Sequence, residues 1–203
     1  MDRPDTRAAL VDHATHLIRA RGYSAFSYAD LATAVGIRKA SIHHHFPTKE
    51  ELGIEVVARY NAWFRQRLAE IDALDAGPRT RLERYAALYR EGLVNDEACL
   101  CGMIAAETAA VPPAVAAGVA TFFATNRAWL ACLIEAGQRS GDFPTRQLPT
   151  RLAAAVLATL EGGVFVARGL NDITAFDEAV AATITMLQSE PVEGPITKTT
   201  SRR

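Results

Sequence analysis

The sequence has little net charge of either sign. It holds 22 lysines and arginines against 23 aspartates and glutamates, which gives a formal net charge of -1. Residues 1–60 are nearly as balanced, with 8 basic against 7 acidic side chains, although all five histidines lie there. No global field attracts a polyanion, so any contact with nucleic acid has to come from a local patch.

Signals for secretion or membrane insertion are also missing. The first ten residues, MDRPDTRAAL, are polar and charged, which does not fit a signal peptide. The longest apolar stretch, residues 152–170, is interrupted by Glu161, the pair Gly162-Gly163 and Arg168, whereas a membrane span needs about 20 apolar residues. Three cysteines in a chain of this length indicate reduced thiols, not a disulfide framework. We expect a soluble, cytoplasmic protein with no membrane partner.

Patterns that carry catalysis are absent as well. The sequence has no paired carboxylates, nucleophile elbow, glycine-rich phosphate loop or metal-ligand spacing. We therefore predict no enzyme activity, no catalytic residues, no cofactor and no metal. A small all-α enzyme with an apolar pocket and a helical ligand-binding or adaptor protein are kept as alternatives, and neither would bind duplex DNA in a salt-dependent way.

Apolar residues recur at helical spacing along almost the whole chain, and no alternating strand pattern occurs. The fold is predicted to be all-α, with a domain of three short helices over residues 1–48 and a larger helical domain over 49–188. Helix 49–71 would connect the two, and residues 189–203 are predicted to form a disordered tail. The expected helices cover residues 5–22, 27–36, 38–45, 49–71, 82–93, 112–133, 152–170 and 176–187, with a short apolar piece at 99–110.

Residues 27–45 have the proportions of a helix-turn-helix motif. Ser27 and Asp30 form an N-cap pattern, and Gly36 supplies the positive φ that the tight turn needs. Apolar residues at 31, 35, 37 and 42 would hold the two helices together. The second helix would then turn its polar side chains outward, as a helix does when it enters the major groove, so residues 1–48 are predicted to form a helix-turn-helix DNA-binding domain.

Three consecutive histidines, residues 43–45, raise the question of a metal site. Successive helical residues point about 100° apart, so the three rings cannot converge on one ion. The i, i+4 histidine spacing of a helical zinc site is also missing. His43 and His44 are predicted to face phosphates or base edges and His45 to pack inward or to cap; solvated surface histidines are the alternative.

The segment FSYADLATAVGIRKASIHHHFPTKEEL, residues 26–52, resembles the DNA-binding domain of tetracycline-repressor-type (TetR family) regulators, and the resemblance extends over residues 7–63. This family usually has tyrosine where His43 stands. The resemblance implies that Arg38 and Lys39 read guanine or the backbone, and that Ser27 and Tyr28 approach a phosphate at a helix start. The full set of implied DNA contacts is Ser27, Tyr28, Arg38, Lys39, Ser41, His43, His44 and Lys49.

For the second half, the same resemblance implies a homodimer through helices 152–170 and 176–187, and an internal site for an unknown small-molecule effector. It thus implies a repressor that a small apolar or electrophilic effector releases from a near-palindromic double-stranded DNA operator. A plain core helix is the alternative for residues 152–170. The candidate lining residues, each of which could equally be core, are Tyr89, Met103, Phe122, Phe123 and Trp129.

The segment CLCGMIAAE, residues 99–107, is similar to a segment in the branch of the family that senses electrophiles or unsaturated carbonyl compounds. The resemblance implies that Cys99 is the sensor and Cys101 an accessory thiol. A reactive thiol needs a lowered pKa, and the neighbouring Asp96 and Glu97 would oppose that. Buried, inert cysteines therefore remain the alternative.

Overall fold

The computed structural model describes residues 6–189, and secondary structure over this range is entirely helical. The predicted all-α fold is confirmed. The elements are α1 (Thr6–Arg21), α2 (Tyr28–Val35), α3 (Lys39–His45), α4 (Lys49–Asp72), α5 (Pro78–Val94), α6 (Leu100–Ala105), the short 3-10 helix η1 (Thr108–Ala110), α7 (Pro113–Ser140), α8 (Pro149–Leu170) and α9 (Thr174–Gln188). The predicted tail falls outside the described residues except for Ser189.

Some helices begin earlier than the apolar spacing indicated, or extend further. Helices α5, α7 and α8 each begin at a proline, where the missing N–H costs no hydrogen bond and the fixed φ suits the first turn. Helix α7 also runs on to Ser140, where Gly141 ends it with a φ of 86°. The apolar piece at 99–110 divides into α6 and η1.

The helix-turn-helix is built by local capping and a small core. The Ser27 side chain accepts from the Ala29 and Asp30 backbone N–H groups, and Asp30 closes the capping box. At the other end of α2, Gly36 has a φ of 72°, the left-handed conformation that such a turn requires. Leu31 and Ile42 are fully buried, so α3 is held by its apolar side with its polar side outward.

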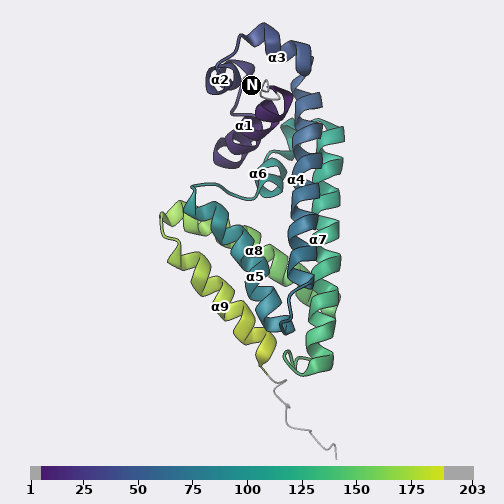
Figure 1. The fold of residues 1–203 in the computed structure, drawn as a ribbon. Helices are drawn as coiled ribbons and strands as arrows, with labels where there is room; N and C mark the ends of the chain where they lie inside the picture. Colours follow the sequence, from purple (N-terminus) through teal and green to yellow (C-terminus); the bar gives the residue numbers. More distant parts are fainter. Residues whose placement is uncertain (1–5, 190–203) are drawn as a thin grey trace, which may run out of the picture.

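Helices α1–α3 form a small unit at one end of the molecule, and α4 leads from it along the length of α7 (Figure 1). Helices α5, α8 and α9 form the other end, and α6 lies between them and α1. By length and composition alone, α7 and α8 could cross a membrane. In the structure they pack against each other, and α7 also packs on α4, as the core helices of a bundle do.

Candidate functional site

The outer side of α3 carries the first group of candidate residues. Arg38, Lys39, Ser41, His43 and His44 are all exposed, whereas Ile42 between them is buried. Arg38 is the N-cap and Lys39 the first helical residue. Within residues 6–189, neither of their side chains makes a hydrogen bond or an ion pair, so both basic groups are available to a ligand.

The histidines have different neighbours. The His43 ring contacts the Tyr28 ring edge to face at 4.9 Å, and its Nδ1 lies 3.2 Å from the Pro47 carbonyl oxygen. When Nδ1 carries the proton, it donates to the Pro47 carbonyl oxygen, and Nε2 remains free to accept a hydrogen bond from another group. The His45 ring is partly buried and packs on the exposed His44 ring at 5.6 Å. His43 and His44 are thus held on the exposed side of α3.

The Tyr28 side chain is turned into the N-terminal domain. It is buried, and its hydroxyl lies 2.7 Å from the Thr48 carbonyl oxygen and 2.9 Å from that of Phe46. These two carbonyls occupy the hydroxyl, and burial raises the pKa of Tyr28 to about 12. Tyr28 thus ties the start of α2 to the segment between α3 and α4, and its predicted approach to a phosphate stays a prediction.

Lys49 is also partly engaged inside the molecule. Its Nζ donates to the Phe26 carbonyl oxygen at 2.6 Å and lies over the Phe26 and Tyr23 rings, 4.2 and 4.8 Å from their centroids. Burial lowers the pKa of this amine. Lys49 thus joins the start of α4 to the loop before α2, while Ser27 stays exposed at the cap of α2.

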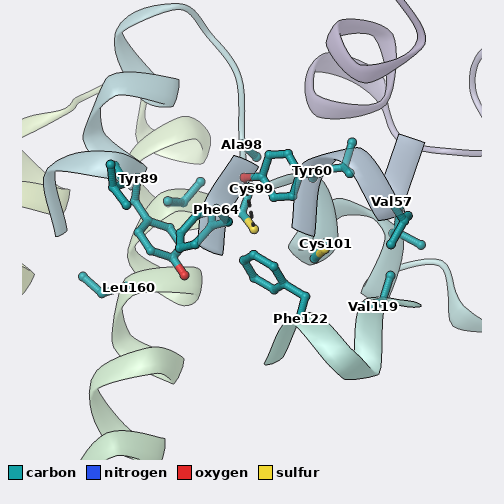
Figure 2. Close-up of a cluster of buried hydrophobic side chains, with 14 of the residues drawn as sticks. Val57, Tyr60, Phe64, Tyr89, Ala98, Cys99, Cys101, Val119, Phe122 and Leu160 are labelled. Carbon is teal, nitrogen blue, oxygen red and sulfur yellow. Dashed lines mark hydrogen bonds between the residues drawn. The ribbon is translucent and has the colours of Figure 1, made fainter. Parts of the chain in front are cut away.

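The second candidate site is a cluster of aromatic rings and thiols in the larger domain (Figure 2). The Phe64 and Phe122 rings lie 4.9 Å apart, and Tyr60 packs on Phe122 at 5.6 Å. Of the predicted lining residues, Tyr89, Cys99, Cys101 and Phe122 belong to this cluster, and all four are buried. In this structure they pack on one another as core.

The other predicted lining residues lie at the edge of this cluster. Phe123 and Met103 are partly buried, and the Phe123 ring contacts that of Phe122 at 5.4 Å. The Trp129 ring stacks on Tyr85 at 5.1 Å, and its Nε1 donates to the Asp72 carboxylate at 2.9 Å. The sequence alone does not distinguish Tyr60, Phe64 and Tyr85 as cluster residues, because an aromatic residue at helical spacing looks the same whether it lines a site or fills a core.

Both thiols are in surroundings that oppose ionisation. Burial raises the pKa of Cys99 and Cys101 well above its usual range, and the neighbouring Glu161 carboxyl adds to the rise in both. The Tyr60 hydroxyl lies 3.9 Å from the Cys99 Sγ. The acid that opposes ionisation is thus Glu161 of α8, whereas Glu97, which the sequence suggested, forms an ion pair with Arg19 at 2.6 Å.

Glu161 is the polar group that the sequence analysis missed. Both carboxyl oxygens are buried, and neither has a hydrogen-bond partner among the described residues. Burial raises the pKa of Glu161 to about 7, and weak hydrogen bonding from the Cys99 thiol and the Tyr89 hydroxyl, outside regular geometry, opposes part of that rise. The carboxyl reaches α6 at Gly102, where a Cβ would overlap its Oε2.

Helix α6 and its flanking residues connect this cluster to α1. Glu97 pairs with Arg19, and the Arg19 Nε donates to the Ala98 carbonyl oxygen at 2.9 Å. After α6, Glu107 accepts from the Ser24 backbone N–H at 2.7 Å. From α8, Arg168 donates to the Ala20 carbonyl oxygen at 2.9 Å. A shift of α6 or α8 would therefore be transmitted to α1.

Similarity to known proteins agrees with this architecture. Residues 10–56 match the family described as bacterial regulatory proteins, tetR family, and residues 78–183 match the Tetracyclin repressor-like C-terminal domain. The HTH-type transcriptional repressor DhaR of a Mycobacterium species is 26% identical over 166 residues, 81% of this chain and 83% of that repressor. The repressor NemR of Escherichia coli is 30% identical over 89 residues, 44% of each chain.

A crystal structure of a TetR family transcriptional regulator from Agrobacterium tumefaciens has the same fold. It superposes with a TM-score of 0.87 at 28% identity, and the match covers 91% of this chain and 98% of that chain. Together with the second family match, which alone spans more than half of the residues, the exposed α3 and the long helical domain identify the chain as a member of the TetR family, DNA-binding transcriptional regulators that are not enzymes.

Proposed function

We propose that the protein is a homodimeric, cytoplasmic repressor that binds a near-palindromic operator and leaves it when a small effector enters the aromatic and thiol cluster. The observation that carries the proposal is the geometry of α3, which is anchored by the buried Ile42 and exposes Arg38 and Lys39, both without a partner among the described residues. A helix of this kind places its first residues nearest the base edges in the major groove.

The proposed DNA contacts divide into two groups. Arg38 and Lys39 match the two guanine acceptors in the major groove, so they would read bases. Ser27, Ser41, His43, His44 and Lys49 would contact the backbone. Since Lys49 already donates to Phe26, its charge would reach a phosphate with its remaining N–H groups.

The proposed dimer uses α8 and α9. Large apolar side chains on these helices stay exposed in the single chain, with Val166 at 55%, Leu170 at 66% and Met186 at 66% exposure. Apolar surface of this kind marks an interaction site when it is contiguous. Two copies would set their α3 helices about 34 Å apart, one turn of duplex DNA.

The effector is proposed to act by favouring a conformation in which the cluster is open. Since the cluster is closed in this structure, an effector that binds only the open form would shift the population toward it. Helix α6 would move with the thiols, and its contacts with Arg19 and Ser24 would carry the shift to α1. The separation of the two α3 helices would then change.

Two kinds of effector fit the cluster: a small, largely apolar molecule that binds without a covalent bond, or an electrophile that reacts with Cys99. The burial of both thiols and their raised pKa favour the noncovalent effector. Replacement of Cys99 by Ser separates the two. Release of DNA by an unsaturated carbonyl compound that persists in Cys99→Ser excludes an adduct at that residue.

The test of the proposed function is binding to duplex DNA. An inverted repeat from the region upstream of the protein's own coding sequence is titrated at several salt concentrations, with a scrambled duplex as the control. We expect one dimer per repeat, tight binding that weakens steeply with salt, and weaker binding to the scrambled duplex. Equal affinity for both duplexes, or a chain that stays monomeric on the DNA, would contradict the proposal.

A further inference from the structure

The Glu161 carboxyl is the least satisfied polar group in the interior of the described residues. It lies on the inner side of α8, and both of its oxygens are buried without a hydrogen-bond partner of regular geometry. The Cys99 thiol and the Tyr89 hydroxyl are the only neutral donors near enough among the described residues to stabilise its anion in part. An unpaired buried carboxylate costs several kcal/mol, so interiors normally pair such a group or keep it neutral. Within residues 6–189 the side chains that face it supply no cation, because they are Cys99, Cys101 and the three tyrosines 60, 85 and 89.

The surroundings of Glu161 are shaped to admit the carboxyl. A side chain on Gly102 of α6 would overlap its Oε2, so this glycine provides the space that the carboxyl occupies. Aromatic rings surround the same region: Tyr60 and Phe64 of α4, Tyr85 and Tyr89 of α5, and Phe122 of α7. Ring faces attract cations through their quadrupoles, and this attraction grows when water is excluded.

A surface hollow shares one wall, Tyr60, with this region. It is lined by Asp12, Thr15, Arg19, Arg59, Tyr60 and Trp63 and has a volume of about 220 Å³. Its arginines are paired, Arg59 with Asp12 and Arg19 with Glu97. Tyr60 is the shared wall, because it lines the hollow and its hydroxyl lies 3.9 Å from the Cys99 Sγ. A rotation of Tyr60 and Trp63 would connect the hollow with the thiols and the carboxyl behind them.

We propose that Glu161 is the anchor of the effector site and that the effector is an organic cation, an apolar body with a protonated or quaternary nitrogen that pairs with this carboxylate among the aromatic rings. This inference rests on the proposed function, since it specifies the class of effector that would open the cluster. The positively charged nitrogen of the ligand pairs with Glu161, which has no cationic side chain facing it within residues 6–189. The apolar part of the ligand packs on the aromatic rings that become accessible when Tyr60 rotates.

The pH dependence of binding provides an independent sign. Burial raises the pKa of Glu161 to about 7, so its anion becomes the main form only above that pH. The facing groups Tyr60, Tyr85, Tyr89, Cys99 and Cys101 stay neutral to higher pH, because burial raises the pKa of each. The nearby Arg19 and Glu97 are paired with each other. Binding of a quaternary cation should therefore strengthen between pH 6 and pH 8.

The test uses benzyltrimethylammonium as the cation and neopentylbenzene, the neutral hydrocarbon of the same shape, as its control. Binding to the full chain is followed by tryptophan fluorescence, since Trp63 lines the hollow. We expect the cation to bind at least about tenfold more tightly than the hydrocarbon, and Glu161→Gln to remove about tenfold of its affinity. The exposed Glu135→Gln, which removes the same charge from the surface, is the matched control.

Equal affinity of the parent and Glu161→Gln for the cation, no binding of the cation by the parent, or a preference of the parent for the hydrocarbon would overturn the inference. Duplex binding is measured on the same preparations. Retained DNA binding without cation binding rejects this inference alone, whereas loss of specific DNA binding by the parent rejects the proposed function. If Glu161→Gln still binds the cation at pH 8 as tightly as the parent does, the cationic nitrogen is bound by a group other than Glu161.

Discussion

At the scale of single residues, the fold separates side chains that it uses itself from those that it leaves for a ligand. Tyr28 belongs to the first kind, because its hydroxyl bonds to backbone carbonyls inside the N-terminal domain. Lys49 is intermediate, since its Nζ donates to the Phe26 carbonyl oxygen and keeps other N–H groups for a phosphate. Arg38 and Lys39 belong to the second, since they project from the start of α3 without a partner within residues 6–189. This difference divides the expected effects of mutation between stability and DNA readout.

Replacement of Lys39 by Ala should therefore alter DNA recognition without altering stability. The side chain is exposed, so the free energy of unfolding should change by less than about 0.5 kcal/mol. Loss of a base contact should remove about 1–3 kcal/mol of discrimination at one base pair. A binding selection on randomised duplexes measures this, with Arg65→Ala on the exposed side of α4 as a control for lost charge. The same selected sequence for Lys39→Ala and the parent would count against base readout.

Glu161 should make stability depend on pH in a way that its amide variant does not. Its pKa is about 7 in the folded chain against an ordinary 4.5, so the folded state holds the proton more tightly. A raised pKa of an acid contributes stability at low pH that is lost as pH rises toward the folded value. Relative to Glu161→Gln, the parent should lose about 2–3 kcal/mol per chain between pH 5 and pH 8.

Urea unfolding of both proteins measures this difference. The protein concentration is kept the same for both, because the stability of an oligomer depends on concentration. The other ionisable groups are common to both proteins and cancel in the comparison. A difference in unfolding free energy that stays constant from pH 5 to pH 8 would mean that Glu161 has its ordinary pKa and is solvated in the folded state.

At the scale of helices, the local sequence predicts where helices begin and end, whereas contacts between distant segments decide which side chains are buried. The caps at Ser27 and Thr48 and the left-handed Gly36 could be predicted, because each depends on residues within one turn of the chain. The buried role of Tyr28 could not, since its partners are residues 46 and 48. Glu161 looked like an interruption of an apolar helix; its meaning depends on α5 and α6, which lie about 60 to 70 residues away in the sequence.

The contact between α1 and the segment before α6 should be the strongest link between the two domains. Arg19 and Glu97 are mostly buried, and their ion pair spans 2.6 Å. Removal of one partner leaves the other charge buried without compensation, so Glu97→Ala should lower the free energy of unfolding by about 3 kcal/mol. The double variant Arg19→Ala, Glu97→Ala should recover part of this loss, because no buried charge is left unpaired; the second partner of Glu97, His16, is mostly exposed.

A double-mutant cycle by chemical denaturation gives the coupling energy directly. The exposed i, i+4 pair Arg79–Glu83 is the matched control, and its coupling should stay below about 0.5 kcal/mol. A coupling for Arg19 and Glu97 as small as that of the control would show that solvent screens the pair, and that α6 is joined to α1 by other contacts.

At the scale of the whole molecule, the exposed side of α8 indicates what covers it. The absence of a side chain at Gly163 is explained within the single chain, because a Cβ there would lie 3.2 Å from the Phe176 ring. No contact among the described residues explains the glycine at position 162, because a Cβ there would meet no atom within 4 Å. Yet glycine inside a helix costs about 1 kcal/mol relative to alanine. The proposed dimer would supply this reason, because a second copy packed closely on this side of α8 would leave no room for a side chain at Gly162.

Replacement of Gly162 by Leu therefore distinguishes a monomer from a dimer, because its two effects have opposite signs. In a single chain, leucine at this open position should stabilise the helix by several tenths of a kcal/mol or more. In a dimer packed through α8, the added side chain should separate the helices and raise the dissociation constant. Sedimentation equilibrium measures the second effect and unfolding at low concentration the first.

The matched control is Gly141→Asn, also open but at a left-handed turn, which should leave dimerisation unchanged. A Gly162→Leu chain that dimerises as tightly as the parent would place the interface elsewhere, and the spacing of the two α3 helices would have to be derived anew.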